Sequence, residues 1–360
     1  MAKAVTASDK RAPEKANGKR MAMDGLSKDP LHAMLHWMLL GRRFEEKTAE
    51  GYAIGRIGGF CHLYIGQEAV AAGAITALRP DDYVLTAYRD HVQALIKGVP
   101  PRSVMAELYG RADGCSGGKG GSMHMFSAEH NLLGGWGIVG GQLPLAIGVG
   151  WAIKYRNQDR VCLCFMGEAA VNQGAFHESL NMAALWELPV IFIVENNQFG
   201  MGTAWTRAAS RVDIAPKAQA YDMPAAVVDG MDVLAVRRTI QEAVDRARNA
   251  RLPTLIEARC YRFMGHSMSD PVHGVYRTKE EVEEQKGRDP IRNFIDQLKE
   301  AGLLSEDELL ALDARAHAEV DDAAAFADAS PEPGPDALHR DVYARINEHG
   351  RLFFDETGRG

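Results

Sequence analysis

Cysteine is scarce in this sequence of 360 residues. The five cysteines are odd in number, and none lies in the C-x-x-C spacing that is typical of zinc sites and thioredoxin-like redox sites. This argues against both kinds of site and against a small scaffold held by disulfides, and it favours a reducing compartment. Cys162 and Cys164 alternate along an apparent strand, so we expect both side chains to point to one buried face.

Long apolar runs and an excess of positive charge are also missing. The longest apolar runs, such as residues 189–194, are far too short to cross a bilayer. Lys and Arg number 41 against 48 Asp and Glu, a net charge of -7, whereas phosphate affinity is built from clustered positive charge. We therefore expect no membrane span and no nucleic-acid partner, and we expect partners among small molecules and proteins.

The ends of the chain indicate the domain organisation. Residues 1–28 are basic and rich in alanine but lack the apolar segment of a secretory signal, so we predict a flexible N-terminal tail. A mitochondrial transit peptide is the alternative, although Asp9 and Glu14 disfavour it because such peptides are poor in acidic residues. Residues 29–360 are predicted to form a single domain with a helical C-terminal part, including an amphipathic helix within residues 301–330.

The clearest structural signal is a strand–helix–strand unit. Residues 161–166 and 190–194 are apolar throughout, as expected for parallel strands covered on both faces, and the segment 175–187 between them is predicted to be a helix. A further strand is expected at residues 254–258. We therefore predict an α/β fold, a doubly wound and mostly parallel sheet with helices on both faces.

The glycines concentrate between Gly110 and Gly150. No repeat period links them and apolar residues are interleaved, so we expect ordered loops in which the backbone approaches a ligand, followed by a helix at residues 142–154.

Part of this segment, from Gly135 to Gly140, matches the G-x-G-x-x-G dinucleotide pattern, so a nicotinamide-dependent dehydrogenase is one alternative. The match is weak. Residues 130–133 are barely a strand, and Asp159 precedes the next expected strand instead of following it, as the ribose-binding acid of that fingerprint does.

Polar side chains follow two neighbouring strands. Glu168 comes after the first strand of the unit, and Asn196 and Asn197 end the second. In a doubly wound sheet the carboxyl ends of the strands border the ligand crevice, so these oxygens should lie close together. Mg²⁺ takes one or two carboxylates and completes its shell with phosphate oxygens and water. With backbone N–H groups of the glycine-rich segments nearby, a metal-bridged diphosphate is predicted.

Several motifs in these regions resemble one family. The segment G-E-A-A-V-N-Q-G that continues to E-N-N-Q-F-G-M-G-T (residues 167–203) is similar to the thiamin diphosphate motif of 2-oxo acid dehydrogenase E1 α subunits. Further stretches resemble the pyruvate-specific members, in the family's order: F-C-H-L-Y-I-G-Q-E-A at 60–69, T-A-Y-R-D-H at 86–91, G-G-K-G-G-S-M-H-M at 117–125 and G-H-S-M-S-D-P at 265–271. The resemblance covers residues from about 30 to 350 and implies a thiamin diphosphate-binding fold.

The resemblance implies a role for each residue at the diphosphate end of the cofactor. Glu168, Asn197 and the backbone carbonyl of Phe199 would hold Mg²⁺, and Tyr88 and Arg89 would contact the phosphates, where an arginine offers a bidentate fork. Tyr88 could instead be an ordinary core residue with a satisfied hydroxyl.

At the other end of the cofactor, Gly137 and Val139 would face the aminopyrimidine, and Ala169 and Ala170 would adjoin the cofactor beside the metal ligand. The family's usual G-D-G is G-E-A here, so the carboxylate of Glu168 is one methylene longer. If position 169 needs a left-handed backbone, its Cβ costs about 1–2 kcal/mol.

His62 and His266 match the histidines of the family that line the channel for pyruvate and acyl transfer, although His62 could be a structural hydrogen-bonding residue. His91 and His124 receive no catalytic role. Of the three serines phosphorylated in mitochondrial members, only Ser267 is present, which favours a bacterial, cytoplasmic protein over a mitochondrial one.

The implied activity is thiamin diphosphate-dependent oxidative decarboxylation of pyruvate with reductive acetylation of the lipoyl group of E2. The family's activating glutamate lies on a separate E1 β subunit, so the chain should be inactive alone and active as an α₂β₂ assembly. Within the family, the alternatives are the E1 α subunits of branched-chain 2-oxo acid and acetoin dehydrogenases. The alternative of a different class is a structural E1 α-like subunit without catalytic activity.

Overall fold

A computed structural model describes residue 23 and residues 25–340. Most of the predicted tail, and residues 341–360 of the predicted domain, lie outside the described residues. The division into a tail at 1–28 and a single domain at 29–360 therefore stays a prediction. Within the described part no helix has both the length and the apolar character that a membrane span needs.

A sheet of parallel strands lies at the centre of the fold, in the order β2-β1-β3-β4-β8-β7. The strands are β1 (Tyr83–Ala87), β2 (Leu132–Trp136), β3 (Cys162–Gly167), β4 (Val190–Asn196), β7 (Ala225–Asp229) and β8 (Thr254–Arg259). A small antiparallel pair, β5 (Phe199–Gly200) and β6 (Thr203–Ala204), follows β4. The predicted strands at 161–166, 190–194 and 254–258 are confirmed as β3, β4 and β8, and so is the predicted fold class.

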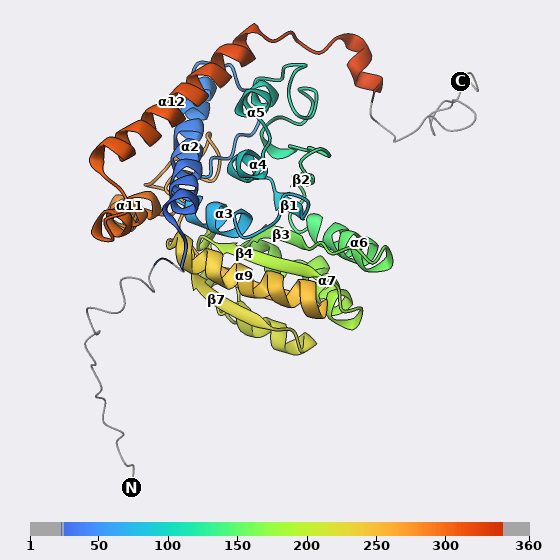
Figure 1. The fold of residues 1–360 in the computed structure, drawn as a ribbon. Coiled ribbons are helices and arrows are strands. Elements are labelled where there is room, and N and C mark those ends of the chain that lie inside the picture. Colours follow the sequence, from blue (N-terminus) through green and yellow to red (C-terminus); the bar gives the residue numbers. More distant parts are fainter. Residues whose placement is uncertain (1–22, 24, 341–360) are drawn as a thin grey trace, which may run out of the picture.

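Helices cover both faces of the sheet. On one face lie α2 (Lys28–Ala53), α3 (Glu68–Ile75), α4 (His91–Lys97), α5 (Pro101–Leu108), α9 (Val233–Ala250), α11 (Pro290–Glu300) and α12 (Glu306–Ala329), and on the other lie α6 (Gln142–Tyr155) and α7 (Gly174–Leu185). Shorter helices are α8 (Trp205–Ala208) and α10 (Lys279–Lys286), with 3₁₀ turns η1 (Gly121–Met123), η2 (Glu168–Asn172), η3 (Ala215–Tyr221) and η4 (Pro335–His339). Figure 1 shows α2, α4, α5 and α12 stacked on one side of the strands.

The side chains of β3 explain why helices are needed on both faces. Leu163 and Phe165 join the core under α2 and α3, whereas Cys162 and Cys164 join the core under α6 and α7. Period-two alternation of apolar residues on both faces gives a strand that has no solvent side. The expectation that the two cysteines share one buried face is confirmed.

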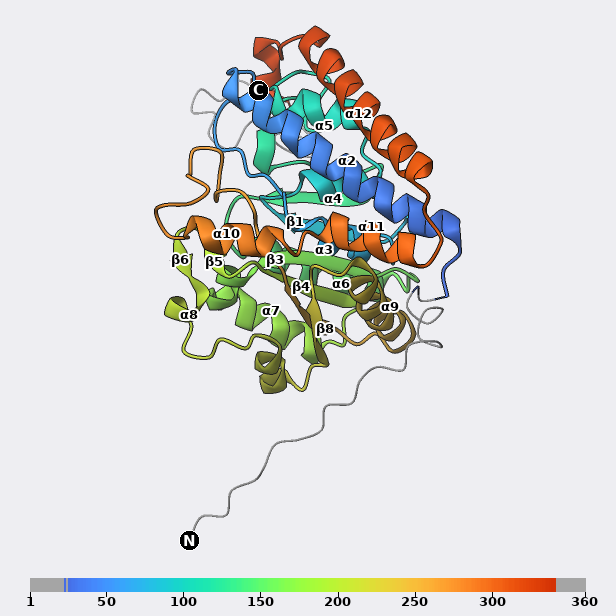
Figure 2. The same ribbon diagram turned by 90° about the vertical axis from the view of Figure 1, so that its left-hand side faces the viewer.

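The helix predicted within residues 301–330 is confirmed as α12, which runs beside α2 although the two are far apart in the sequence (Figure 2). Its first turn is fixed by a capping box, in which the Ser305 side chain accepts from the Glu308 N–H and the Glu308 side chain accepts from the Ser305 N–H. The helix predicted at residues 142–154 is confirmed as α6.

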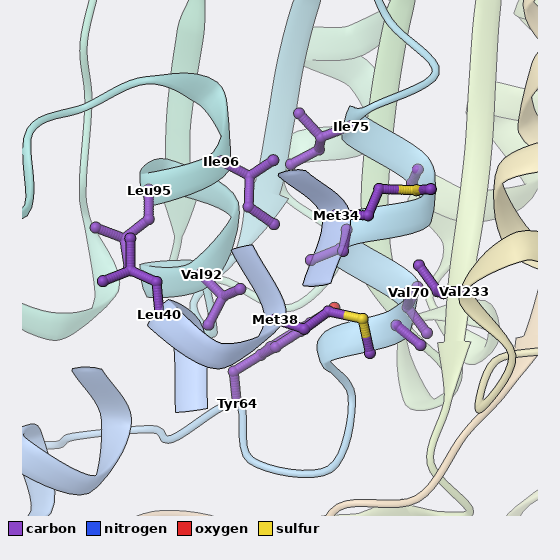
Figure 3. Close-up of a cluster of buried hydrophobic side chains, with 14 of the residues drawn as sticks. Met34, Met38, Leu40, Tyr64, Val70, Ile75, Val92, Leu95, Ile96 and Val233 are labelled. Atoms are coloured by element: carbon purple, nitrogen blue, oxygen red, sulfur yellow. The ribbon is translucent and has the colours of Figure 1, made fainter. Parts of the chain in front are cut away.

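A buried cluster lies where α2, α3 and α4 meet. Met34 and Met38 of α2 pack near Val70 of α3 and Val92 of α4 (Figure 3). The Tyr64 side chain reaches into the same cluster and is fully buried. The cluster thus supports residues 61–64, a segment outside any helix or strand that leads into the functional site.

Candidate functional site

A cavity of about 220 Å³ opens at the carboxyl ends of the strands. Its walls come from the segments that follow β1, β2, β3, β4 and β8, as expected for the crevice of a doubly wound sheet. The residues that line it are Gln67, Ala87, Tyr88, Arg89, Val139, Gly140, Gln142, Gly167, Glu168, Ala169, Ala170, Glu195, Asn197, Phe199, Gly200, Met201, Arg262 and His266.

All residues predicted for the site except His62, Gly137 and Asn196 line this cavity, and the Asn196 side chain donates to Glu257 instead. His62 adjoins it, because its ring lies 4.6 Å from the ring of Tyr88 and 5.1 Å from the ring of His266, centroid to centroid. Gly137 lies against His124 instead, and a Cβ at this glycine would come within 3.1 Å of the His124 ring.

Glu168 presents a carboxylate oxygen that has no partner in the described structure. The residue begins η2 directly after β3, its side chain is 1% exposed, and its Oε1 forms no hydrogen bond. Burial raises the pKa of the Glu168 carboxyl. A buried, unpaired carboxylate oxygen is costly unless a cation or a proton meets it, so this atom is suited to a metal ion.

Asn197 brings an amide beside this carboxylate from the neighbouring strand. Residue Gly167 of β3 pairs with Glu195 of β4, so the residues just beyond both strand ends are neighbours. The Asn197 Nδ2 donates to the Gln67 Oε1 at 3.2 Å. The Asn197 Oδ1 accepts from the backbone N–H of Phe199.

Within the described residues, no group of three or more His, Cys, Asp or Glu side chains could hold a metal ion. One carboxylate, one amide and a backbone carbonyl do not make a zinc-type site. They do suit Mg²⁺, which uses few protein carboxylates and takes its remaining oxygens from phosphate and water.

Two buried arginines face the cavity, and neither forms an ion pair with a carboxylate of the described chain. The guanidinium of Arg89 donates to the backbone carbonyls of Leu63 and His266, and Arg262 donates to Met264 O at 3.1 Å. Burial, together with the charge of Arg89, lowers the pKa of Arg262 to about 10. Buried cations without acidic partners favour an anionic ligand such as a diphosphate.

Sequence reasoning missed Arg262, Glu195 and Gln67 as lining residues. Glu195 lies at the end of β4, where burial raises the pKa of its carboxyl to about 7 and the hydroxyl of Tyr64 donates to it. The strand-end rule that pointed to Asn196 and Asn197 also applies to Glu195, so a signal was available for this residue.

The histidines of the site are neutral near neutral pH. Burial and the charge of Arg89 lower the pKa of His62 to about 2 and that of His266 to about 4. The Nδ1 atom of each ring is buried and has no hydrogen-bond partner in the described structure. A neutral imidazole donates one hydrogen bond and accepts another, so each ring can orient a ligand in the cavity.

The glycine-rich segment at residues 114–121 does not offer its N–H groups to a ligand, contrary to the expectation from sequence. A fully buried carboxylate, that of Glu107 on α5, accepts hydrogen bonds from the N–H groups of Ser116, Gly118, Gly120 and Gly121 at 2.7 to 3.0 Å. The segment forms an anion-binding turn, but the anion is part of the protein.

The Ala169 backbone is not left-handed, so the Cβ at this position carries no such strain. Its Cβ instead fills the space opposite Gly200, where an added Cβ would approach to 2.8 Å. The exchange of the family's glycine for alanine is therefore accommodated by packing against a glycine of β5.

The lead-in to the G-x-G-x-x-G match is a strand after all, since β2 runs through Leu132–Trp136. This corrects the expectation for residues 130–133. The nicotinamide pattern still fails, because β1 lies between β2 and β3, and Asp159 precedes β3 at the surface, where it pairs with Arg79 at 2.8 Å.

Comparison with known proteins shows the family of the chain. The model of the family described as "Dehydrogenase E1 component" matches residues 36–336. The pyruvate dehydrogenase E1 component subunit alpha of Rhizobium meliloti (strain 1021) is 49% identical over 306 residues, which cover 85% of this chain and 87% of that protein. Proteins of the same name from Porphyra purpurea and Zymomonas mobilis are 46% and 48% identical, covering 89% and 85% of this chain and 94% and 86% of their own lengths.

Proposed function

The chain belongs to the dehydrogenase E1 component family, and from this we propose that it is the α subunit of a thiamin diphosphate-dependent pyruvate dehydrogenase E1. Its activity is the oxidative decarboxylation of pyruvate with reductive acetylation of the lipoyl group of E2. The observation that carries the proposal is the cavity in which the unpaired Glu168 carboxylate shares one space with buried Arg89 and Arg262. The relatives' common name supports pyruvate over branched-chain acids and acetoin.

The residues of the cavity divide between the metal and the phosphates. Mg²⁺ would be held by the side chains of Glu168 and Asn197 and by the backbone carbonyl of Phe199. Arg89 and Arg262 would bind the diphosphate oxygens, with Tyr88 beside them.

The aminopyrimidine would lie toward Gly137 and Val139, and Ala169 and Ala170 would form the apolar wall beside the diphosphate. When bound, thiamin diphosphate supplies the carbanion that attacks the keto carbon of pyruvate and the electron sink that follows. This chain contributes the binding and the orientation of the cofactor.

His62 and His266 are the candidate catalytic residues. Both rings are neutral and lie 5.1 Å apart, centroid to centroid, so together they can position an acyl acceptor through hydrogen bonds that a neutral imidazole donates and accepts. This role is consistent with reductive acetylation of a lipoyl group that reaches the cavity from outside.

An E1 β subunit is the proposed partner. The exposed apolar side chains of Val139 and Met201 line the cavity, and exposed Ile138 directly precedes Val139. Large apolar residues at the rim of a polar site mark an interaction surface. We propose an α₂β₂ assembly that receives the lipoyl domain of E2, in the bacterial cytoplasm predicted above.

Co-expression with a candidate E1 β subunit tests the function. We expect pyruvate-dependent acetylation of a lipoyl domain by the assembled complex, much slower turnover of branched-chain 2-oxo acids, and no turnover by the chain alone. Preference for a branched-chain acid would transfer the proposal to that substrate. A complex that forms but neither binds thiamin diphosphate with Mg²⁺ nor turns over any 2-oxo acid would support the non-catalytic alternative.

A further inference from the structure

The segment at residues 61–64 carries a candidate catalytic histidine without the support of a helix or strand. Two of its backbone N–H groups donate to side chains from distant elements. The N–H of His62 donates to the Ser122 Oγ at 3.1 Å, and the N–H of Tyr64 donates to the Glu45 Oε1 at 2.8 Å. Side chains thus accept the hydrogen bonds that a neighbouring strand would accept if this segment were part of a sheet.

The carbonyl groups of the same segment tie it to the rest of the cavity. The Cys61 carbonyl accepts from the N–H of Met268 at 2.8 Å, which belongs to the loop that carries His266. The Leu63 carbonyl accepts from the guanidinium of Arg89. A shift of this segment would therefore move His62 itself and, through these bonds, the loop that carries His266.

The two N–H bonds converge on one buried carboxylate. Glu45 Oε2 lies 2.8 Å from His91 Nδ1, and His91 Nε2 lies 2.8 Å from the Ser122 Oγ that holds His62. Glu45 and His91 are fully buried and Ser122 is 4% exposed. One oxygen of Glu45 therefore holds Tyr64 directly, and the other holds His62 through His91 and Ser122.

The Glu45 carboxylate also acts on the pKa of His91. Burial lowers the pKa of His91 and the Glu45 carboxylate raises it, and the net shift is upward. The Nδ1 of His91 donates to the Glu45 carboxylate, and its Nε2 shares a hydrogen bond with Ser122 Oγ, which accepts the N–H of His62 as well.

Ser122 is held from the other side as well. It directly follows the turn whose N–H groups bind the buried carboxylate of Glu107, and the last of those bonds, from Gly121, is 3.0 Å long. The position of Ser122 is therefore fixed by two carboxylates, that of Glu45 on α2 and that of Glu107 on α5.

We propose that Glu45, His91 and Ser122 form a positioning relay that fixes the backbone of His62 so that its ring meets Tyr88 and His266. None of the three lines the cavity, so they act through His62 and not on a substrate. The proposal rests on the proposed function, in which His62 serves acyl transfer. A displacement of about 1 Å in a reacting group can cost about a hundredfold in rate.

The test compares Ser122→Ala with Ser179→Ala in the assembled complex. Ser179 is a matched control because it is also a buried serine, but its Oγ has no hydrogen-bond partner in the described structure. In Ser122→Ala, we expect the amide of His62 to exchange hydrogen about tenfold faster by mass spectrometry. Turnover number with a lipoyl domain should fall about tenfold, whereas KM for pyruvate and thiamin diphosphate affinity should stay within about twofold. Ser122→Thr should restore the exchange rate of the His62 amide and the turnover number, and Ser179→Ala should change neither quantity.

Unchanged exchange at residues 60–64 in Ser122→Ala would overturn the relay, whatever the activity. Faster exchange with full turnover would overturn its positioning role. A parent complex without acetylating activity would contradict the proposed function instead, and the exchange comparison would still decide whether the relay holds His62. Should Ser122→Ala fail to assemble, His91→Gln breaks the link to Glu45, and the same two readouts apply.

Discussion

The guanidinium of Arg89 donates a 2.8 Å hydrogen bond from Nη2 to the backbone carbonyl of His266. Arg89 follows β1 and lines the cavity, whereas His266 lies in the loop after β8, so this bond joins an anion-binding arginine to the loop of a candidate catalytic residue. Within that loop Asp270 accepts from the His266 N–H at 2.8 Å and from the Tyr276 hydroxyl. An anion that orders Arg89 should therefore order this loop.

Cofactor binding should protect residues 262–276 from proteolysis. Residues 273–275 of the loop are exposed, and Arg89 becomes a fixed anchor for the loop once its charge is matched by a diphosphate. Limited proteolysis of the assembled complex, with and without Mg²⁺ and thiamin diphosphate, measures the effect. Equal cutting of this loop in both conditions would count against it.

The variant His266→Ala should separate acyl transfer from cofactor binding. The ring faces His62 and Tyr88, whereas the bond to Arg89 uses the backbone carbonyl, which the variant retains. We expect turnover with a lipoyl domain to fall about tenfold or more and thiamin diphosphate affinity to change less than about threefold. Equal losses in both quantities would show that the side chain serves cofactor binding instead.

Stability should depend on pH through His266. The pKa of this group is lowered from 6.5 to about 4 by burial and by Arg89, so between these values the unfolded chain binds a proton that the folded chain excludes. The contribution of His266 to the stability of the parent should therefore fall as the pH falls through this window. His266→Gln should lose less stability between about pH 7 and about pH 5, by roughly 1–2 kcal/mol.

Urea unfolding of the parent and of His266→Gln at both pH values gives this difference. Asp90 and Glu195, whose pKa values are each raised to about 7 mainly by burial, contribute with the opposite sign. Because they are present in both proteins, their contributions cancel in the comparison. Parallel pH dependences of the two proteins would contradict the assignment of His266 as a buried neutral group.

Glu107→Ala should destabilise the fold strongly. The variant leaves four partly buried N–H groups at residues 116–121 without their acceptor, and breaking a buried charged network costs about 3–5 kcal/mol. Glu107→Gln keeps one acceptor oxygen and should lose less. Urea unfolding measures both variants, and a loss of less than about 1 kcal/mol in Glu107→Ala would show that the turn holds its shape without the carboxylate.

The sequence predicted that Glu168 and Asn197 lie close together. Two apolar strands joined by one helix are expected to be parallel neighbours, so their carboxyl ends lie side by side. The sequence did not reveal Arg262. This residue follows β8, and the place of β8 beside β4 depends on the whole sheet order and not on any local pattern. The glycines at 114–121 indicated an anion-binding turn, but their spacing could not show that the anion is Glu107.

Titration of thiamin diphosphate into the assembled complex, with and without Mg²⁺, tests the account most directly. It should be carried out on the parent, on Glu168→Ala and, as the control that retains a carboxylate, on Glu168→Asp. The account predicts Mg²⁺-dependent binding that weakens about tenfold or more in Glu168→Ala, because metal sites lose that much affinity even when only a residue hydrogen-bonded to a ligand is changed. Binding should survive in Glu168→Asp, which keeps a carboxylate. An affinity in Glu168→Ala equal to that of the parent would remove this carboxylate from the metal site and contradict the account.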